Sequence, residues 1–135
     1  MVPINYWAVL VGAVVAMILG FIWYGPLFGK KWAKLSGLSM DKMKPNPVHM
    51  GIMALGALLM SFVLSHAIIF ASAYLKETGV SAGLMGALWN WLGFVAPVTI
   101  GVVLWEGKSW HLWFINAGYY LVSLILMSLV LTLWV

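Results

Sequence analysis

The chain has 135 residues, of which 64% are hydrophobic, only 7% are charged and none is cysteine. Because soluble domains are about 25% charged, this composition excludes an ordinary water-soluble domain, a disordered chain and a disulfide scaffold. The absence of cysteine also excludes thiol catalysis, iron–sulfur clusters and zinc–thiolate sites.

Four stretches of the chain carry no charged side chain, and each is long enough to cross a membrane. These stretches are residues 1–29, 45–75, 78–105 and 109–135. A transmembrane helix needs about 20 predominantly apolar residues, and short loops make successive helices antiparallel neighbours. The sequence therefore predicts one all-α domain over residues 1–135, a polytopic membrane protein built as an antiparallel bundle of four transmembrane helices.

The first predicted helix covers residues 4–28 and has aromatic side chains at both ends, as an interfacial belt requires. Pro26 lacks an N–H group and clashes with the preceding turn, so it should break or kink the end of this helix. A polar loop over residues 29–47 follows and carries five lysines. Within this loop we expect a short surface helix over residues 30–38, with Trp32 facing the lipid.

The other three predicted helices follow with shorter connections. The second helix covers residues 48–75, and at about 1.5 Å per residue it is long enough that it must tilt or protrude. The third helix covers residues 82–105, with Ser81 as its expected N-cap and Pro97 inside it. The fourth helix covers residues 110–135.

The lysines indicate how these helices are oriented. The loops at 29–47 and 106–109 share one side of the predicted membrane and carry six lysines, whereas the opposite side carries only Lys76. Because cytoplasmic loops are enriched in lysine and arginine, we place both loops in the cytoplasm and both termini outside. No basic residue precedes the first helix, so we do not expect it to be a cleavable signal peptide.

Small side chains recur at every fourth position of the first predicted helix. This stripe consists of Ala8, Gly12, Ala16 and Gly20. Small residues let another helix backbone approach closely, which is the main route to helix packing where lipid removes the hydrophobic driving force. The stripe therefore predicts either tight packing within one chain or an interface between copies in a homo-oligomer.

Two polar side chains lie deep in the predicted membrane. His66 in the second helix and Asn90 in the third are at similar depths from the outer side, so a hydrogen bond between them is expected. Ionisable groups inside membranes are often functional, which makes the pair a candidate for proton handling or ligand binding. The alternative is a neutral histidine that is satisfied by Asn90 or Ser65.

A second polar cluster is predicted at the cytoplasmic ends of the helices. It comprises Tyr24, Asn46, His49, Glu106, His111 and Asn116. Asn116, Tyr119 and Ser123 share one helical face, which should turn inward because amide groups in a membrane need partners. The alternative role of this cluster is to cap loops and anchor helices.

Four short motifs, in this order along the chain, resemble one known family. They are residues 23–32 (WYGPLFGKKW), 93–97 (GFVAP), 105–108 (WEGK) and 115–119 (INAGY). Together they resemble domain-of-unknown-function family 1761, small bacterial integral membrane proteins of four helices, over about residues 5–135. Family members often have histidine after the last motif, where this chain has Tyr120, so no histidine-dependent role is expected there. The resemblance implies membrane location and topology, but no activity.

The motifs and the topology together predict where a site should lie. The motif residues map to the cytoplasmic half, so a site should open inward between Pro26, Pro97 and the Asn116–Tyr119 face. Interrupted helices there would expose backbone groups to a ligand. The residues expected to contact a ligand are Tyr24, Pro26, Pro97, Glu106, Asn116, Tyr119, His66 and Asn90.

The favoured function is the binding or passage of a small neutral or amphipathic molecule, or of a lipid. The alternative is a non-catalytic membrane scaffold or assembly partner that works through helix–helix contacts. A continuous polar cavity would favour passage, whereas a filled core with an exposed small-residue stripe would favour the scaffold. Expected partners are membrane lipids, a small molecule and further copies of the chain, and not nucleic acid.

Enzyme activity is not expected, because the sequence has no phosphate loop, nucleophile elbow or His-Glu-x-x-His motif. No catalytic residue is therefore assigned. His49, Glu106 and His111 have the chemistry of metal ligands, but two loops would have to bring them together. Neither a metal nor another cofactor is expected.

Overall fold

The computed structural model describes residues 2–38 and 46–134, which are mostly helical. The elements in chain order are α1 (Tyr6–Ile22), the π-helical turn η1 (Trp23–Leu27), α2 (Gly29–Ser36), α3 (Pro47–Leu75), α4 (Gly79–Phe94), α5 (Ala96–Thr99), α6 (Gly101–Leu104) and α7 (Trp110–Leu133). Four stretches are long and apolar enough to cross a membrane, namely Tyr6–Leu27, Pro47–Leu75, Gly79–Leu104 and Trp110–Leu133. The predicted all-α, polytopic class is confirmed, and the chain is a multi-pass membrane protein. The predicted loop residues Lys42 and Lys44 lie outside the described residues.

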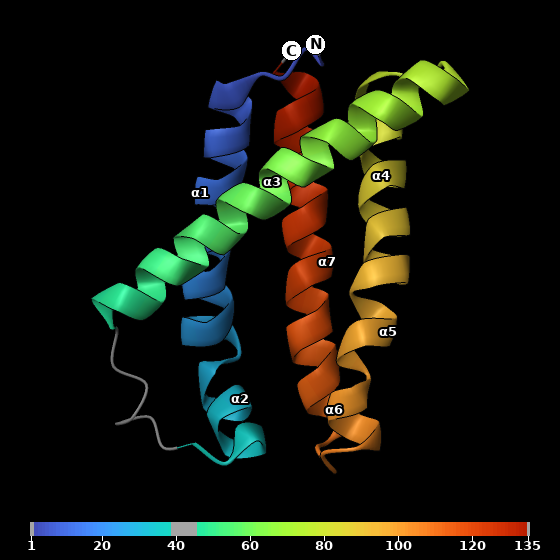
Figure 1. The fold of residues 1–135 in the computed structure, drawn as a ribbon. Helices are drawn as coiled ribbons and strands as arrows, with labels where there is room; N and C mark the ends of the chain where they lie inside the picture. The colour runs from blue at the N-terminus through green and yellow to red at the C-terminus, as the bar shows by residue number, and fades with distance from the viewer. Residues whose placement is uncertain (1, 39–45, 135) are drawn as a thin grey trace.

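The central element of the fold is α7, which packs against α1 on one side and α4 on the other (Figure 1). The long helix α3 crosses this group obliquely and contacts α1, α4 and α7. Both termini lie at one end of the molecule, and α2 and α6 lie at the opposite end, the α2 end (Figure 1).

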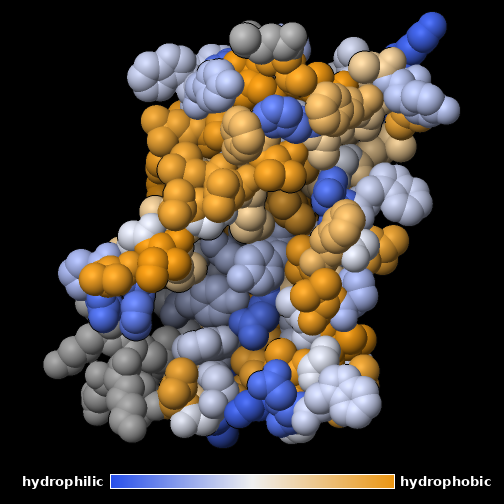
Figure 2. All heavy atoms as spheres, in the orientation of Figure 1, coloured by the Kyte–Doolittle hydropathy of each residue, from blue (hydrophilic) through white to orange (hydrophobic). Residues whose placement is uncertain are grey.

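The oblique course of α3 differs from the side-by-side arrangement predicted for the four helices. With 29 residues, α3 is about 43 Å long. Its buried side chains begin only at Ala57, and those from Pro47 to Leu55 are mostly exposed. The first third of α3 therefore projects from the bundle, and Figure 2 shows a hollow in the face beneath it.

Small residues hold α1 against its neighbours. Gly12 and Ala16 are buried, and a Cβ atom on Gly12 would lie only 2.7 Å from Ser61 Oγ of α3. Gly20 leaves room for the Tyr119 hydroxyl, which lies 3.2 Å from where its Cβ atom would be. The predicted small-residue stripe is thus used for packing within the chain, one of its two predicted roles.

The first span ends in a π-helical turn. Pro26 has no N–H group to donate, and the Phe28 N–H donates to the Trp23 carbonyl oxygen at 2.9 Å. The next helix, α2, starts at Gly29, where a Cβ atom would lie 2.6 Å from the Tyr24 carbonyl oxygen. The predicted interruption at Pro26 and the predicted short helix after it are both confirmed.

The third span, predicted over 82–105 with an interruption at Pro97, is interrupted. It starts earlier, at Gly79, and is divided at Val95 and Ile100 into α4, α5 and α6. Pro97 accounts for the first division, because it cannot donate a backbone hydrogen bond and disfavours helical geometry before it. The division allows this part of the span to follow a different path from α4.

Side-chain caps define the starts of two long helices. Asn46 Oδ1 accepts a hydrogen bond of 2.9 Å from the first turn of α3, and Ser109 Oγ accepts one of 3.0 Å from the first turn of α7. Ser81 is not the N-cap that was predicted. It lies inside α4, and its hydroxyl donates to Glu77 Oε2 at 3.3 Å.

Large apolar side chains cover the outside of the helices. The exposed fraction is 75% for Phe94 and 69% for Trp7, and Figure 2 shows hydrophobic residues over much of the upper half of the visible face. Soluble monomers rarely expose apolar surface of this extent. A surrounding bilayer accounts for it.

Candidate functional site

Hydrogen bonds join the first and last spans at the α2 end. Asn116 of α7 is at their centre, because its Oδ1 accepts from the Tyr24 hydroxyl at 2.8 Å and from Trp32 Nε1 at 3.1 Å. A carbonyl oxygen has two lone pairs, so these two donors use its accepting capacity. The Asn116 Nδ2 atom makes no hydrogen bond to any residue that the structure describes. Trp32 therefore turns inward, and its predicted orientation toward lipid is wrong.

The π-helical turn and the small residues beside it position this group. Trp23 Nε1 donates to the Ile115 carbonyl oxygen, and the Tyr119 hydroxyl donates to the Ala16 carbonyl oxygen, both at 2.9 Å. A Cβ atom on Gly118 would lie 3.4 Å from the Trp23 ring, so the indole packs directly on the α7 backbone. Wide turns of this kind occur frequently at functional sites, and here the turn directs two adjacent aromatic residues at α7.

The interrupted third span forms the opposite wall. Trp113 Nε1 of α7 donates to Thr99 Oγ1 at 3.0 Å, and the Thr99 hydroxyl donates to the Val95 carbonyl oxygen at 2.6 Å. One turn further along α7, Trp91 Nε1 donates to the Ala117 carbonyl oxygen at 2.8 Å. These bonds hold α4 and α5 against α7, and they use most of the polar atoms of this wall.

A cavity of about 300 Å³ lies between the two walls, and it is called here the head cavity. It is lined by Tyr24, Thr99, Val102, Trp113, Asn116 and Tyr120. Three of these six side chains are aromatic and none is charged. Small-molecule sites have this character, with apolar and aromatic walls and a few polar groups that fix orientation.

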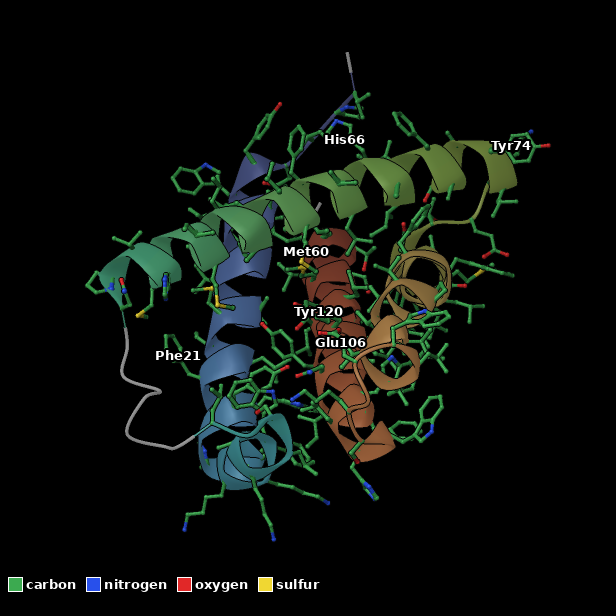
Figure 3. The ribbon with its side chains drawn as sticks, turned by 60° about the horizontal axis from the view of Figure 1, so that its bottom comes forward. Phe21, Met60, His66, Tyr74, Glu106 and Tyr120 are labelled. Carbon is green, nitrogen blue, oxygen red and sulfur yellow. The ribbon has the colours of Figure 1, made fainter. Side chains whose placement is uncertain are left out.

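A second cavity, of about 160 Å³, lies beneath α3 and is called here the tail cavity. Tyr120 lines both cavities, so the two adjoin. Figure 3 shows Met60 of α3 pointing toward α7, with Tyr120 in the space below it. Ser123 also lines the tail cavity; it is 1% exposed, and its hydroxyl has no partner in the described part of the chain.

The structure separates the predicted site residues into two groups. Those that line the two cavities are Tyr24, Asn116 and Tyr119. Pro26 and Pro97 are exposed and act on the cavities only by interrupting their helices. Glu106 is also exposed, lies in the turn between α6 and α7 (Figure 3), and belongs to neither lining.

The predicted hydrogen bond between His66 and Asn90 is wrong. His66 Nδ1 lies 2.9 Å from the Phe62 carbonyl oxygen of its own helix, and its ring is on the side of α3 that faces away from the bundle (Figure 3). Asn90 Nδ2 donates to the Gly86 carbonyl oxygen at 2.7 Å, also within its own helix. In each case the helix backbone one turn earlier provides a nearer partner than the neighbouring helix does.

Some residues of the head cavity were not predicted to belong to a site. Trp113 and Tyr120 lie three positions before and four positions after Asn116, so the helical period alone indicates that they share its face. Thr99 and Val102 carry no comparable signal. Their position depends on where the third span divides, which the sequence does not specify.

The described residues contain no group of three or more histidine, aspartate or glutamate side chains that could hold a metal ion. His49, Glu106 and His111 are each exposed. The expected absence of a metal or other cofactor stays a prediction.

A larger cavity, of about 580 Å³, lies at the end that carries the termini. Several of its polar groups are already used. Asn5 Nδ2 donates to the Trp134 carbonyl oxygen at 2.9 Å, and Asn5 Oδ1 accepts from the Ala8 N–H at 3.2 Å. The Thr132 hydroxyl donates to its own helix at 2.8 Å. We therefore take the α2 end, where Asn116 has unused donors, as the candidate site.

Comparison with known proteins identifies the family. The family model described as "Protein of unknown function (DUF1761)" matches residues 7–132. The chain belongs to the DUF1761 family. The resemblance inferred from the sequence motifs is confirmed, and the match includes every residue of the head cavity. No curated protein and no solved structure matches the chain, and the description of DUF1761 states no activity.

Proposed function

We propose that this DUF1761 protein binds a small neutral or amphipathic molecule in the head cavity and catalyses no reaction. The observation that carries the proposal is the Asn116 amide, whose Nδ2 has no partner among the described residues while its Oδ1 is fully occupied. Asn116 lines the head cavity, so its N–H groups are accessible there and can donate to a bound molecule. A bound molecule would supply the missing partner.

The lining also supports an uncharged ligand. None of its six side chains is charged, and the Glu106 carboxylate at the same end is exposed outside it. A charged ligand would lose its hydration and find no opposite charge in return. A neutral head group avoids that cost.

We infer that the head cavity faces the cytoplasm of a bacterial inner membrane. Lys30, Lys31, Lys34 and Lys108 belong to the α2 end, whereas Lys76 follows α3 at the other end. Cytoplasmic loops carry the excess of lysine. The head cavity and the larger cavity at the termini share no lining residue. We therefore propose binding at the α2 end alone, because passage through the protein would require the helices to rearrange.

A single-cysteine reporter tests the proposed binding site, because the chain has no native cysteine. Val102 lines the head cavity, whereas Val98 is 72% exposed on the outer surface of the same span. Each is replaced by cysteine in the full chain, and alkylation by the neutral reagent N-ethylmaleimide is timed in nanodiscs. We expect benzyl alcohol, a small neutral probe, to slow the reaction of Val102→Cys in a saturable way and to leave Val98→Cys unchanged. A Val102→Cys rate that no concentration of benzyl alcohol alters would refute the proposed site.

A scaffold that works as a homo-oligomer is a second candidate, and the projecting start of α3 favours it. Nothing lies within 4 Å of where a Cβ atom on Gly51 would be, and Val48, Ile52 and Leu55 around it are exposed. A glycine on an open apolar helix lets a second helix approach closely. We expect Gly51→Cys to form disulfide dimers in membranes faster than Val98→Cys, and equal rates would count against this interface.

A further inference from the structure

We propose that the ligand is an uncharged amphiphile whose carbonyl oxygen accepts hydrogen bonds from Asn116 and Tyr120 and whose apolar chain lies in the tail cavity. This inference rests on the proposed function and names the class of ligand for the same site. It also assigns a route of entry, sideways from the bilayer beneath α3.

The Asn116 amide offers only hydrogen-bond donors to the head cavity. Asn116 Oδ1 already accepts two hydrogen bonds, so only the N–H groups of its amide remain. The Thr99 hydroxyl accepts from Trp113 and donates to its own helix. The Tyr120 hydroxyl, which also lines the cavity, makes no hydrogen bond within the described part of the chain and can donate or accept. The Asn116 N–H groups, with Tyr120 able to donate beside them, match a ligand that presents an acceptor.

A carbonyl oxygen is the acceptor that fits these walls. A carboxylate or phosphate would need a lysine or arginine partner, and among the described residues no lysine or arginine lines either cavity. A hydroxyl group can also accept from Asn116, but it brings an O–H donor, and with Asn116 Oδ1 occupied only hydroxyl oxygens of the lining can accept it. A ketone or similar carbonyl group accepts strongly, carries no charge and brings no donor.

The lining of the tail cavity suits an apolar chain. It is lined by four methionines and four small residues, together with two tyrosines. Methionine is flexible and polarizable, so it adapts to chains of different shape. Gly56 adds open space, because nothing lies within 4 Å of where its Cβ atom would be.

The entry route follows from the course of α3. Met53 lines the tail cavity and is also 56% exposed on the outside of the molecule. The hollow beneath α3 is open in Figure 2, on a face that the bilayer surrounds. An amphiphile dissolved in the bilayer can therefore reach the tail cavity without crossing water.

The test compares two probes that differ by one functional group, 2-tridecanone and tridecane. Both are added to the Val102→Cys reporter in nanodiscs of ether-linked phosphatidylcholine, whose lipids contain no carbonyl group. We expect the ketone to slow alkylation at about a tenth of the concentration that the hydrocarbon requires, since one net hydrogen bond of about 1.4 kcal/mol corresponds to tenfold. Equal potency of the two probes overturns the inference.

Matched variants assign the contacts. Tyr120→Phe keeps the ring and removes the hydroxyl, and we expect it to reduce the tenfold preference for the ketone to threefold or less. Tyr74→Phe is the control, because Tyr74 is 86% exposed. Gly56→Leu should fill the tail cavity and raise at least fivefold the concentration of each probe that slows alkylation. Gly51→Leu, on the projecting part of α3, should not change these concentrations. Full ketone preference in Tyr120→Phe, or equal effects of the two glycine variants, contradicts the inference.

Failure of this inference can be separated from failure of the proposed function. If benzyl alcohol protects the reporter but the ketone does not, the head cavity binds small molecules and the carbonyl amphiphile is wrong. If neither protects, both proposals are wrong. If alkylation without any probe is slower in nanodiscs of ester-linked phosphatidylcholine than in the ether-linked ones, the occupant is a phospholipid. That result overturns the inference that the ligand is uncharged.

Discussion

Gly29→Ala is the substitution that best tests how the candidate site is held together. A Cβ atom on Gly29 would lie 2.6 Å from the Tyr24 carbonyl oxygen and 3.1 Å from its carbonyl carbon. Both atoms belong to the backbone, so no side-chain rotation relieves the contact. The turn that carries Tyr24 must shift against α2, which carries Trp32, and both hydrogen bonds to Asn116 are disturbed.

The expected loss of stability follows from three contributions. Forcing extra volume into a packed site costs about 1–3 kcal/mol. Hydrogen bonds between membrane helices average about 0.6 kcal/mol, so disturbing the two bonds to Asn116 adds about 1 kcal/mol. The better helix propensity of alanine offsets up to about 1 kcal/mol. We expect the free energy of unfolding to fall by about 1–4 kcal/mol.

The assay is unfolding of the full chain in detergent by titration with sodium dodecyl sulfate, followed by circular dichroism. Gly25→Ala is the matched control, since Gly25 lies in η1 and a Cβ atom there would have nothing within 4 Å. We expect Gly25→Ala to be as stable as the unsubstituted chain or slightly more stable. If Gly29→Ala unfolds at the same concentration as Gly25→Ala, the close contact at the start of α2 does not position the partners of Asn116.

Three further results are expected. Trp32→Phe removes a half-buried donor and should lower the free energy of unfolding by about 0.5–1 kcal/mol, whereas Trp89→Phe, at a residue 67% exposed, should leave it unchanged in the same titration. Gly12→Leu should abolish the close α1–α3 contact and lower that free energy by more than about 2 kcal/mol, while Gly51→Leu should have no such effect. A reporter fused after Val135 should be active only outside the cytoplasm, and cytoplasmic activity would reverse the proposed orientation.

The number and class of the spans were predictable because they depend on long uncharged stretches. Hydrocarbon excludes charges regardless of how the helices pack, so this signal survives without any tertiary information. The inward face of Asn116 and Tyr119 was predictable for a related reason, because a helical period places them together and buried polar groups need partners. Each of these inferences uses only local sequence.

The parts that were not predictable depend on contacts between distant segments. The inward orientation of Trp32 requires Asn116, which is 84 positions away. Thr99 reaches the head cavity only because the third span divides at Val95 and Ile100, and one proline does not specify where the following helices start. His66 failed as a partner for Asn90 because similar depth in the membrane says nothing about the direction in which a side chain points.

The length of α3 makes the width of the tail cavity depend on the membrane itself. A helix about 43 Å long fits within a hydrocarbon core about 30 Å thick only when it is inclined by about 45°. A thicker bilayer would favour a more upright α3, which would bring Met53 and Gly56 toward α7, and a thinner bilayer would hold them apart. Membrane thickness would then act on this protein as a control of access, with no ligand or covalent change required.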